Sequence, residues 1–131
     1  MSDIEVYYAD AVIPAGPGDQ SYIPIKFIDT GEEIGHVLLT LAHNGNCYIA
    51  WHMDEDWQGK GLMKKALVEL LPHLMKHIHR LVAVIKTTNG RSQNLARAVK
   101  FRYEGTAIQG LRDGHGYYDA EFWALLKEDL G

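Results

Sequence analysis

The chain has 131 residues, of which 47% are hydrophobic and 23% are charged, and its formal net charge at pH 7 is −4. This length suits one domain with a single hydrophobic core, so we expect residues 1–131 to fold as one unit. The acidic balance and the scattered basic residues exclude a general nucleic-acid binder, because that class of protein needs a broad basic face.

The amino terminus and the cysteine content indicate a cellular location. The opening residues, MSDIEVYYAD, are acidic and alternate in polarity, unlike a secretory signal, and no apolar run approaches the length needed to span a membrane. The single cysteine, Cys47, allows no internal disulfide bond, which favours a reducing compartment. We therefore expect a cytoplasmic protein that does not associate with membranes.

Four strands are predicted in the first part of the chain. Their apolar residues alternate or run continuously over residues 4–12, 22–28, 34–41 and 47–53. Prolines and glycines interrupt regular structure between the first two strands, and a polar turn separates the second strand from the third. The Asn-Gly pair at residues 44–45 predicts a tight hairpin before the fourth strand.

Two helices and three further strands are predicted in the rest of the chain. Apolar residues at helical spacing predict a helix over residues 62–77, and Pro72 inside it predicts a kink rather than a break. The run RLVAVIK at 80–86 indicates a buried strand that can pair in parallel. A second helix and a closing hairpin follow at residues 92–99, 103–109 and 117–125. This order predicts an α/β (α+β) fold with one mixed, mostly antiparallel sheet of about six to seven strands and two main helices.

A glycine-rich turn, WQGKGL at residues 57–62, connects the 47–53 strand with the first helix. The first turn of a helix leaves backbone N–H groups unpaired and carries a partial positive charge, so it can bind an anion. Gly59 and Gly61 would let the backbone approach a phosphate without an intervening side chain. The turn lacks the Lys-Ser/Thr end of a nucleotide-binding P-loop and the full GxGxxG of a dinucleotide fold, so a phosphate site and a plain turn both stay open.

Two motifs, in the right order, resemble those of the GNAT-type N-acetyltransferases. Residues 58–63, QGKGLM, fit the pattern Gln/Arg-x-x-Gly-x-Gly/Ala of the acetyl-CoA pyrophosphate loop, apart from Met63 at the Gly/Ala position. Asn89 and Ser92, followed by a leucine, a phenylalanine and a Glu-Gly pair, match the second signature, although a turn residue and an N-cap would also explain them. The tail GYYD at 116–119 resembles the closing strand of the Rim-type branch, which acetylates the N-termini of ribosomal proteins.

The resemblance implies a compact, single GNAT-like domain that binds acetyl-CoA. The strands at 47–53 and 80–86 would run parallel and then splay apart, and the pantetheine arm of the cofactor would lie in the gap like an additional strand. The backbone of the first strand would bind this arm, the loop would bind the pyrophosphate, and the second motif would lie near the arm and its sulfur. The residues that the resemblance assigns to cofactor binding are Trp51, Met53, Gln58, Gly59, Lys60, Gly61, Leu62, Met63, Asn89 and Ser92.

The resemblance also implies that an amine attacks the thioester directly, which requires a proton acceptor for the amine and a proton donor for the leaving thiolate. We expect Ser92 to be the donor, as in the Rim-type branch. His52 and the acidic residues 54–56 are candidates for the acceptor. A histidine that simply faces solvent or packs in the core, and acidic residues that begin a solvated loop, would explain the same positions.

Several positions depart from the better-known members of the family. Ala96 occupies the position of their thiolate-protonating tyrosine, and Cys47 and Ile49 occupy positions where several members carry a glutamate or histidine base. Lys100 replaces the glycine before the motif phenylalanine. These departures motivate an alternative, a catalytically weak or inactive GNAT-fold binding or assembly module that still binds CoA. A plain α/β interaction domain whose loop binds nothing is a third reading.

The segment between the first two strands is short. GNAT domains place two helices there, which form one wall of the acceptor site, but residues 13–22 supply about ten residues, roughly the minimum for one short helix. We expect either a groove open to a large amine acceptor, such as a protein N-terminus or lysine, or a homo-oligomer whose partner chain completes the groove. A small amine also stays open. His73 and His77 share one helical face, but without further ligands they predict no metal site.

Overall fold

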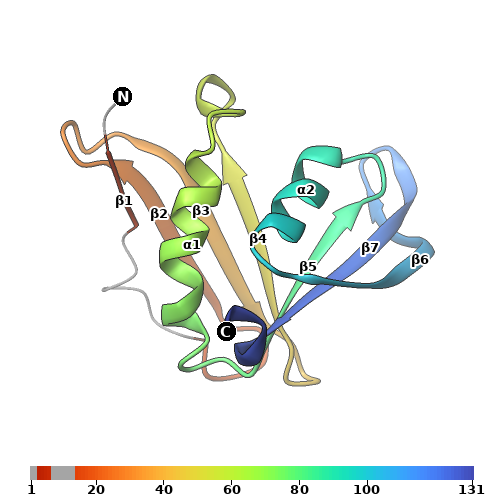
Figure 1. Cartoon of the computed structure of the whole chain (residues 1–131). Coiled ribbons are helices and arrows are strands. Elements are labelled where there is room, and N and C mark those ends of the chain that lie inside the picture. The colour runs from red at the N-terminus through yellow and green to blue at the C-terminus, as the bar shows by residue number, and fades with distance from the viewer. Residues whose placement is uncertain (1–2, 7–13) are drawn as a thin grey trace.

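The computed structural model describes residues 3–6 and 14–131. These residues form a seven-stranded sheet in the order β1-β2-β3-β4-β5-β7-β6, together with two α-helices (Figure 1). Neighbouring strands pair antiparallel except β4 and β5, which are parallel. The predicted fold class, a mixed and mostly antiparallel sheet with two main helices, is confirmed.

Four strands form an antiparallel meander on one side of the sheet. Their bounds are Ile4–Val6 (β1), Gln20–Phe27 (β2), Glu33–Leu41 (β3) and Cys47–Met53 (β4). The bounds of β4 match the prediction, and β2 and β3 begin slightly earlier than predicted. Most of the first predicted strand, residues 7–12, lies outside the described part of the chain.

Helix α1 (Leu62–Leu74) follows β4 after a short 3₁₀ turn, η1 (Glu55–Trp57). Its apolar face packs against the sheet, and the buried residues are Leu62, Met63, Ala66, Leu67, Leu70, Leu71 and Leu74. The helix runs without a break through Pro72, which lies in its last turn. The predicted kink at Pro72 stays a prediction. It ends before the predicted residue 77 because the N–H groups of Lys76 and His77 donate three residues back, to His73 at 3.3 Å and to Leu74 at 3.0 Å.

The rest of the chain extends the sheet past β4. Strand β5 (Arg80–Lys86) leads into helix α2 (Gly90–Ala98), and a long hairpin of β6 (Arg102–Asp113) and β7 (Gly116–Leu126) follows. A second 3₁₀ turn, η2 (Lys127–Leu130), comes after β7. Because β7 inserts between β5 and β6, strand β6 lies at an edge of the sheet, and its two register shifts make it a poor template for pairing with another chain.

The parallel pair of β4 and β5 separates after two residues. Cys47 is opposite Leu81 and Tyr48 is opposite Val82, and the strands diverge beyond these pairs. Figure 1 shows the resulting wedge, with α1 beside β4 and α2 beside β5. The predicted parallel pairing and splaying are therefore confirmed, and the gap between the two strands defines the candidate site.

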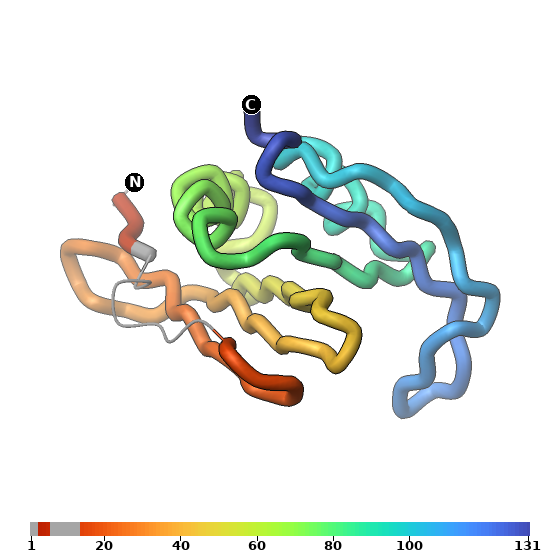
Figure 2. The backbone as a smooth tube through the Cα atoms, turned by 90° about the horizontal axis from the view of Figure 1, so that it is seen from below, coloured from red at the N-terminus to blue at the C-terminus, as the bar shows by residue number. Residues whose placement is uncertain are grey.

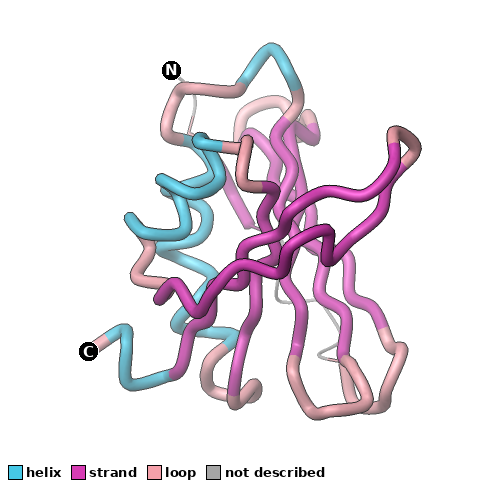
Figure 3. Tube along the Cα trace, turned by 90° about the vertical axis from the view of Figure 1, so that its right-hand side faces the viewer, coloured by secondary structure: helices cyan, strands magenta, loops and turns pink. Residues whose placement is uncertain are grey.

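Both α-helices lie on the same face of the sheet, as Figures 2 and 3 show from two directions. No helix of the described residues covers the other face, from which the tip of the β6–β7 hairpin projects (Figure 3). Residues 14–19, the described part of the short segment before β2, form a turn. In the described part of the chain, no helix is long and apolar enough to cross a membrane.

Helix α2 ends on a lysine in the left-handed conformation. Lys100 has a φ of 77°, and its N–H donates to the carbonyl of Arg97 at 3.1 Å. The N–H of Phe101 donates to the carbonyl of Ala96 at 2.9 Å, which completes a Schellman motif. Glycine is usual at this position because a Cβ strains the left-handed backbone. The geometry explains why a glycine is expected where this chain has Lys100.

Candidate functional site

The backbone of β4 directs two residues into the gap between β4 and β5. The N–H of Asp54 donates to the carbonyl of Ile34 in β3 at 2.8 Å, so the backbone polar groups of Asp54 face β3. Because these groups point to alternate sides along a strand, those of His52 also face β3, whereas those of Trp51 and Met53 face the gap. The gap therefore offers the donors and acceptors of a strand edge without a partner strand at that depth.

A cavity of about 540 Å³ lies on the helix-bearing side of this gap. Its wall comes from the end of β4, the loop before α1 and the first turn of α2. The residues that line it are Trp51, His52, Met53, Trp57, Gln58, Gly59, Gly61, Leu62, Met63, Lys64, Thr88, Asn89, Gly90, Arg91, Ser92 and Leu95. Nine of the ten residues predicted to bind the cofactor are in this set, and Lys60 is the one that is not.

The loop before α1 presents backbone donors to the cavity. Gly59 and Gly61 both have a φ of 75°, which a residue with a Cβ adopts only at a cost, and Gly61 is the N-cap of α1. The first helical bond runs from the N–H of Lys65 to the carbonyl of Gly61 at 3.1 Å. The N–H groups of Leu62 to Lys64 precede it, so they have no acceptor within the helix. Such a cluster of N–H groups binds anions, phosphates in particular.

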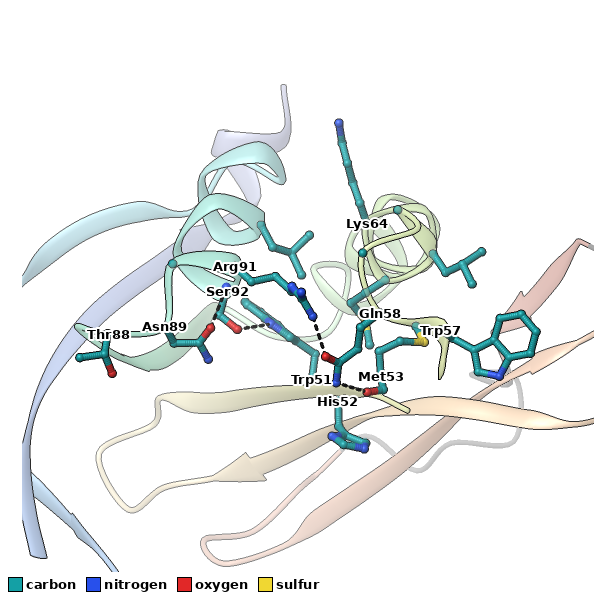
Figure 4. A pocket seen from close by; sticks show the side chains of 16 residues that line it. Trp51, His52, Met53, Trp57, Gln58, Lys64, Thr88, Asn89, Arg91 and Ser92 are labelled. Carbon is teal, nitrogen blue, oxygen red and sulfur yellow. Dashed lines mark hydrogen bonds between the residues drawn. The ribbon is translucent and has the colours of Figure 1, made fainter. Parts of the chain in front are cut away.

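Two side chains and one backbone carbonyl form a hydrogen-bonded chain across the cavity (Figure 4). The Gln58 amide Nε2 donates to the Met53 carbonyl at 2.8 Å, and Arg91 at the start of α2 donates to Gln58 Oε1 at 2.6 Å. Arg91 has none of the ion pairs found among the described residues. A guanidinium with an amide for its partner therefore lies at the rim of a cavity lined by backbone N–H groups.

Ser92 lies where α2 meets β4. Its N–H donates to Asn89 Oδ1 at 3.1 Å, so Asn89 is the N-cap of α2. The interpretation of Ser92 as the N-cap was therefore wrong, because Ser92 lies inside the first turn of α2. The Trp51 indole N–H donates to Ser92 Oγ at 3.3 Å, and the Trp51 ring packs edge-on against Phe101 with ring centroids 5.9 Å apart. Asn89 thus caps helix α2, and the hydroxyl of Ser92 lies at the wall of the cavity.

A second cavity, of about 270 Å³, continues the first one through the gap. The two cavities share Trp51, Asn89 and Ser92. The second cavity is also lined by Lys86 and Tyr118, whose side chains are in contact, with the ammonium 4.5 Å from the ring centroid. A ligand in the first cavity could thus meet a second ligand near Ser92.

The other predicted catalytic residue, His52, has its side chain on the opposite face of β4 from Ser92 (Figure 4). Its imidazole Nε2 is 3.4 Å from Asp54 Oδ1, and its ring lies 5.3 Å from that of His36, centroid to centroid. His36 in turn stacks on Tyr22 at 4.7 Å. The structure therefore does not bring Ser92 and His52 together on one face. The rings of His52, His36 and Tyr22 form a half-exposed row on the face of the sheet opposite the two α-helices, the helix-free face.

Three positions that depart from the family pattern, Cys47, Ile49 and Ala96, are buried, whereas Lys100 is exposed. Ala96 and Cys47 are almost fully inaccessible, and burial raises the pKa of the Cys47 thiol. Cys47 is thus held as a neutral thiol in the core, and no ionisable group stands at Ala96. Among the described residues, no group of three histidine, cysteine or acidic side chains is arranged to hold a metal ion, although the rings of His73 and His77 lie 5.8 Å apart.

Several residues of the two cavities carry functional groups and were not among the predicted site residues, among them Arg91, Lys86 and Thr88. Arg91 was detectable, because it directly precedes Ser92 in the second motif. Lys86 ends β5, and its contact with the cavity follows from the wedge rather than from a local pattern. Lys86 also forms an ion pair with Asp113, and the hydrogen bond between them raises the pKa of Lys86 and lowers that of Asp113.

Comparison with known protein families agrees with this geometry. A model of the acetyltransferase (GNAT) domain matches residues 3–102. The [ribosomal protein uS5]-alanine N-acetyltransferase of Escherichia coli K12 is 38% identical over 85 residues, which cover 63% of this chain and 44% of the relative. The chain thus spans less than half the length of that curated relative.

Solved structures with the same fold include two ribosomal-protein acetyltransferases. The ribosomal L7/L12 alpha-N-protein acetyltransferase RimL, solved in complex with coenzyme A, superimposes with a TM-score of 0.76 at 26% identity, over 87% of this chain and 65% of that one. The ribosomal-protein-S5-alanine acetyltransferase of Vibrio fischeri gives a TM-score of 0.76 at 21% identity, over 86% and 64% of the two chains. The predicted resemblance to the Rim-type branch is confirmed by these matches.

Proposed function

The chain belongs to the GNAT acetyltransferase family, and we propose on this basis that it transfers an acetyl group from acetyl-CoA to a primary amine. The observation that carries the proposal is the gap between β4 and β5. It joins a cavity lined by unpaired backbone N–H groups to a second cavity on the far side of Ser92. A transferase for two substrates needs such a passage, because the donor and the acceptor have to meet without sharing one pocket.

The residues of the first cavity fit acetyl-CoA. The backbone groups of Trp51 and Met53 that face the gap would bind the amides of the pantetheine arm. The N–H groups after Gly61, with Lys64 beside them, would bind the diphosphate. Gly59 and Gly61 leave open space at the positions where a Cβ would project, so nothing in the loop blocks a close approach. Acetyl-CoA would supply the thioester carbonyl that the amine attacks.

Backbone and side-chain groups of this chain would stabilise the charges that develop. The N–H groups of Trp51 and Met53 face the gap and can donate to an oxygen that becomes negative there. The Ser92 oxygen already accepts a bond from the Trp51 indole, which is a donor only. The hydroxyl proton of Ser92 is thus free for a second partner, and we assign it to the leaving thiolate.

His52 is the proposed proton acceptor for the amine. It lies on the helix-free face, the same side of β4 as Ala50, which lines the second cavity. Imidazole can accept a proton near neutral pH, and the carboxylate of Asp54 would stabilise the resulting cation. Of the acidic residues at 54–56, Asp54 is the one that contacts His52, so it would support His52 rather than compete with it. Because His52 itself does not line the second cavity, this role requires a proton path through water.

A protein N-terminus or a lysine is the proposed acceptor. No helix of the described residues covers the face of the sheet opposite α1 and α2 (Figure 3), which favours a large acceptor, and the three ribosomal-protein acetyltransferases described above act on a protein. We also propose that residues 1–131 act as one domain and that the protein is cytoplasmic, with a homo-oligomer as an alternative way to complete the groove.

An acetyl-transfer assay tests the proposal. The release of the CoA thiol would be followed with three acceptors, a peptide with a free N-terminus, the same peptide with a blocked N-terminus and one lysine, and a small primary amine. We expect turnover with at least one peptide well above the uncatalysed rate. Binding of acetyl-CoA without turnover on any amine would contradict the proposal and leave the inactive module.

A further inference from the structure

We propose that Arg91 and Gln58 form a latch on the pantetheine groove, and that the phosphate groups of the cofactor open it. The proposal rests on the function proposed above. In the closed latch, Arg91 holds Gln58 and Gln58 occupies the Met53 carbonyl. When a phosphate takes Arg91, Gln58 is free to leave this carbonyl, which then accepts an N–H of the pantetheine arm.

The first step concerns the Met53 carbonyl. It points into the gap, away from β3, and is one of the strand-edge groups that an extended ligand would use. The Gln58 amide Nε2 donates to it at 2.8 Å. This bond uses one of the two acceptor positions of the carbonyl of a buried residue and places the Gln58 amide at the entrance of the groove. A pantetheine amide therefore competes with Gln58 for this carbonyl.

The second step concerns what holds Gln58 in place. Arg91 reaches from the first turn of α2 and donates to Gln58 Oε1 at 2.6 Å. Both polar atoms of this amide belong to one planar group, so a partner on Oε1 also fixes the direction of Nε2. Figure 4 shows Gln58 between Arg91 and Met53, with a hydrogen bond to each. Without Arg91, the exposed Gln58 side chain would gain rotational freedom and release the carbonyl more readily.

The third step concerns why Arg91 would bind a phosphate in preference to Gln58. A neutral amide oxygen gives the guanidinium one hydrogen bond, whereas a phosphate can accept two and carries the opposite charge. Arg91 lines the same cavity as Lys64 and the N–H groups at the start of α1. A phosphate bound to these groups would therefore lie in the same cavity as the Arg91 guanidinium. In the closed latch, the described residues offer Arg91 no carboxylate in competition.

The latch predicts that the two halves of CoA assist each other. The nucleotide half, with its phosphates, would draw Arg91 away and lower the cost of binding the pantetheine half. A ligand without phosphates would have to break the latch unaided. The binding free energy of complete CoA would thus be more favourable than the sum of the binding free energies of its nucleotide and pantetheine halves.

Calorimetric titrations of CoA and of phosphate-free pantetheine test the latch. The proteins compared would be the wild type, Gln58→Leu, Arg91→Ala and the double variant, each checked for folding by its melting curve. We expect Arg91→Ala to weaken CoA binding about tenfold or more. Gln58→Leu should strengthen pantetheine binding about threefold or more, because no hydrogen bond has to be displaced. In the double variant, the gain for pantetheine should not exceed that of Gln58→Leu alone.

Two controls make the outcomes distinguishable. Arg97→Ala removes an arginine from the same helix but outside both cavities, and it should leave the affinity for CoA unchanged. Saturating 3′-phospho-ADP should raise the pantetheine affinity of the wild type but not that of Gln58→Leu. Equal pantetheine affinity in the wild type and in Gln58→Leu would overturn the latch while the proposed function stands. No binding of CoA to the wild type would overturn the proposed function and the latch with it.

Discussion

Ser92 accepts a hydrogen bond of 3.3 Å from the Trp51 indole, which joins α2 to β4 at the point where the two cavities meet. The bond fixes the position of the Ser92 oxygen and leaves its proton for a partner in the gap. This hydrogen bond connects the fold to the proposed chemistry. It forms where the parallel strands β4 and β5 have separated, so that the Trp51 side chain contacts helix α2.

Ser92→Ala should lower kcat roughly a hundredfold while the Kd for acetyl-CoA stays nearly constant. The variant loses the proton donor for the thiolate but keeps the backbone that binds the cofactor. Ser92→Thr is the matched control, because it keeps a hydroxyl at the same position and should retain much more activity. Steady-state kinetics and a direct binding titration separate the two effects, and unchanged kcat in Ser92→Ala would remove Ser92 from the mechanism.

Gly61→Ala should weaken acetyl-CoA binding more than its loss of stability explains. The new Cβ meets no atom of the protein within 4 Å, but it would project into the phosphate loop, and the φ of 75° adds a backbone cost of about 1–2 kcal/mol. Gly45→Ala has the same kind of strain, with a φ of 83° and open space, in the β3–β4 turn far from the cavity.

The comparison of these two glycine variants isolates the loop. Both should melt at a lower temperature, whereas only Gly61→Ala should lose affinity, and Gly61→Glu should lose it entirely because a negative charge would meet the diphosphate. Wild-type affinity in Gly61→Glu would exclude the loop as the phosphate site.

Lys100→Gly should stabilise the protein by about 1 kcal/mol. The left-handed φ of 77° at the end of α2 strains a lysine and suits a glycine, and the Schellman hydrogen bonds use the backbone alone. Lys100→Ala tests this explanation, since it removes the charged side chain but keeps the Cβ and should not reproduce the gain. Denaturant titration of the three proteins would measure the difference, and an equal gain in both variants would assign it to the side chain.

The pair of Arg80 and Glu104 should make stability depend on pH in the acid range. The hydrogen bonds from the guanidinium lower the pKa of the Glu104 carboxyl below its ordinary value. Its folded-state pKa is depressed, so the contribution is present above the unfolded pKa of about 4.3 and disappears as the pH falls through the folded pKa. Glu104 is 39% exposed, which limits the contribution to about 0.5–1 kcal/mol.

Glu104→Gln measures this contribution. The variant should melt below the wild type at pH 7, and the difference should shrink as the pH falls through the lowered folded-state pKa of Glu104. A constant difference between the two proteins from pH 7 to pH 3 would show that the charge of Glu104 does not contribute.

The sequence was sufficient to predict the strands that frame the site. Strand β4 has a buried, strand-like apolar run bounded by an Asn-Gly turn and by acidic residues, and β5 is a short β-branched run, so their bounds were predicted to the residue. Strand β6 extends to Asp113, beyond the predicted residue 109, because register shifts in the hairpin break the alternation that marks a strand. The local pattern ends there, but the pairing with β7 continues.

The parts of the site that escaped prediction depend on contacts between distant segments. The bond from Arg91 to Gln58 spans 33 positions of the chain, and no local pattern signals it. The side of β4 on which His52 lies follows from alternation, but its neighbour His36 is set by the register of β3 with β4. The left-handed Lys100 was visible only as a departure from the family glycine, and its φ supplies the physical reason.

Thermal unfolding with and without saturating acetyl-CoA, and with ATP as the phosphate control, tests the central claim that acetyl-CoA occupies the gap between β4 and β5. At a hundred times the Kd, specific binding adds about 2.7 kcal/mol to the stability of the folded state. For a domain of this size, we predict a rise in Tm of about 5 to 15 °C with acetyl-CoA, none of similar size with ATP, and none with acetyl-CoA in Gly61→Glu. An unchanged Tm of the wild type with acetyl-CoA would contradict the account.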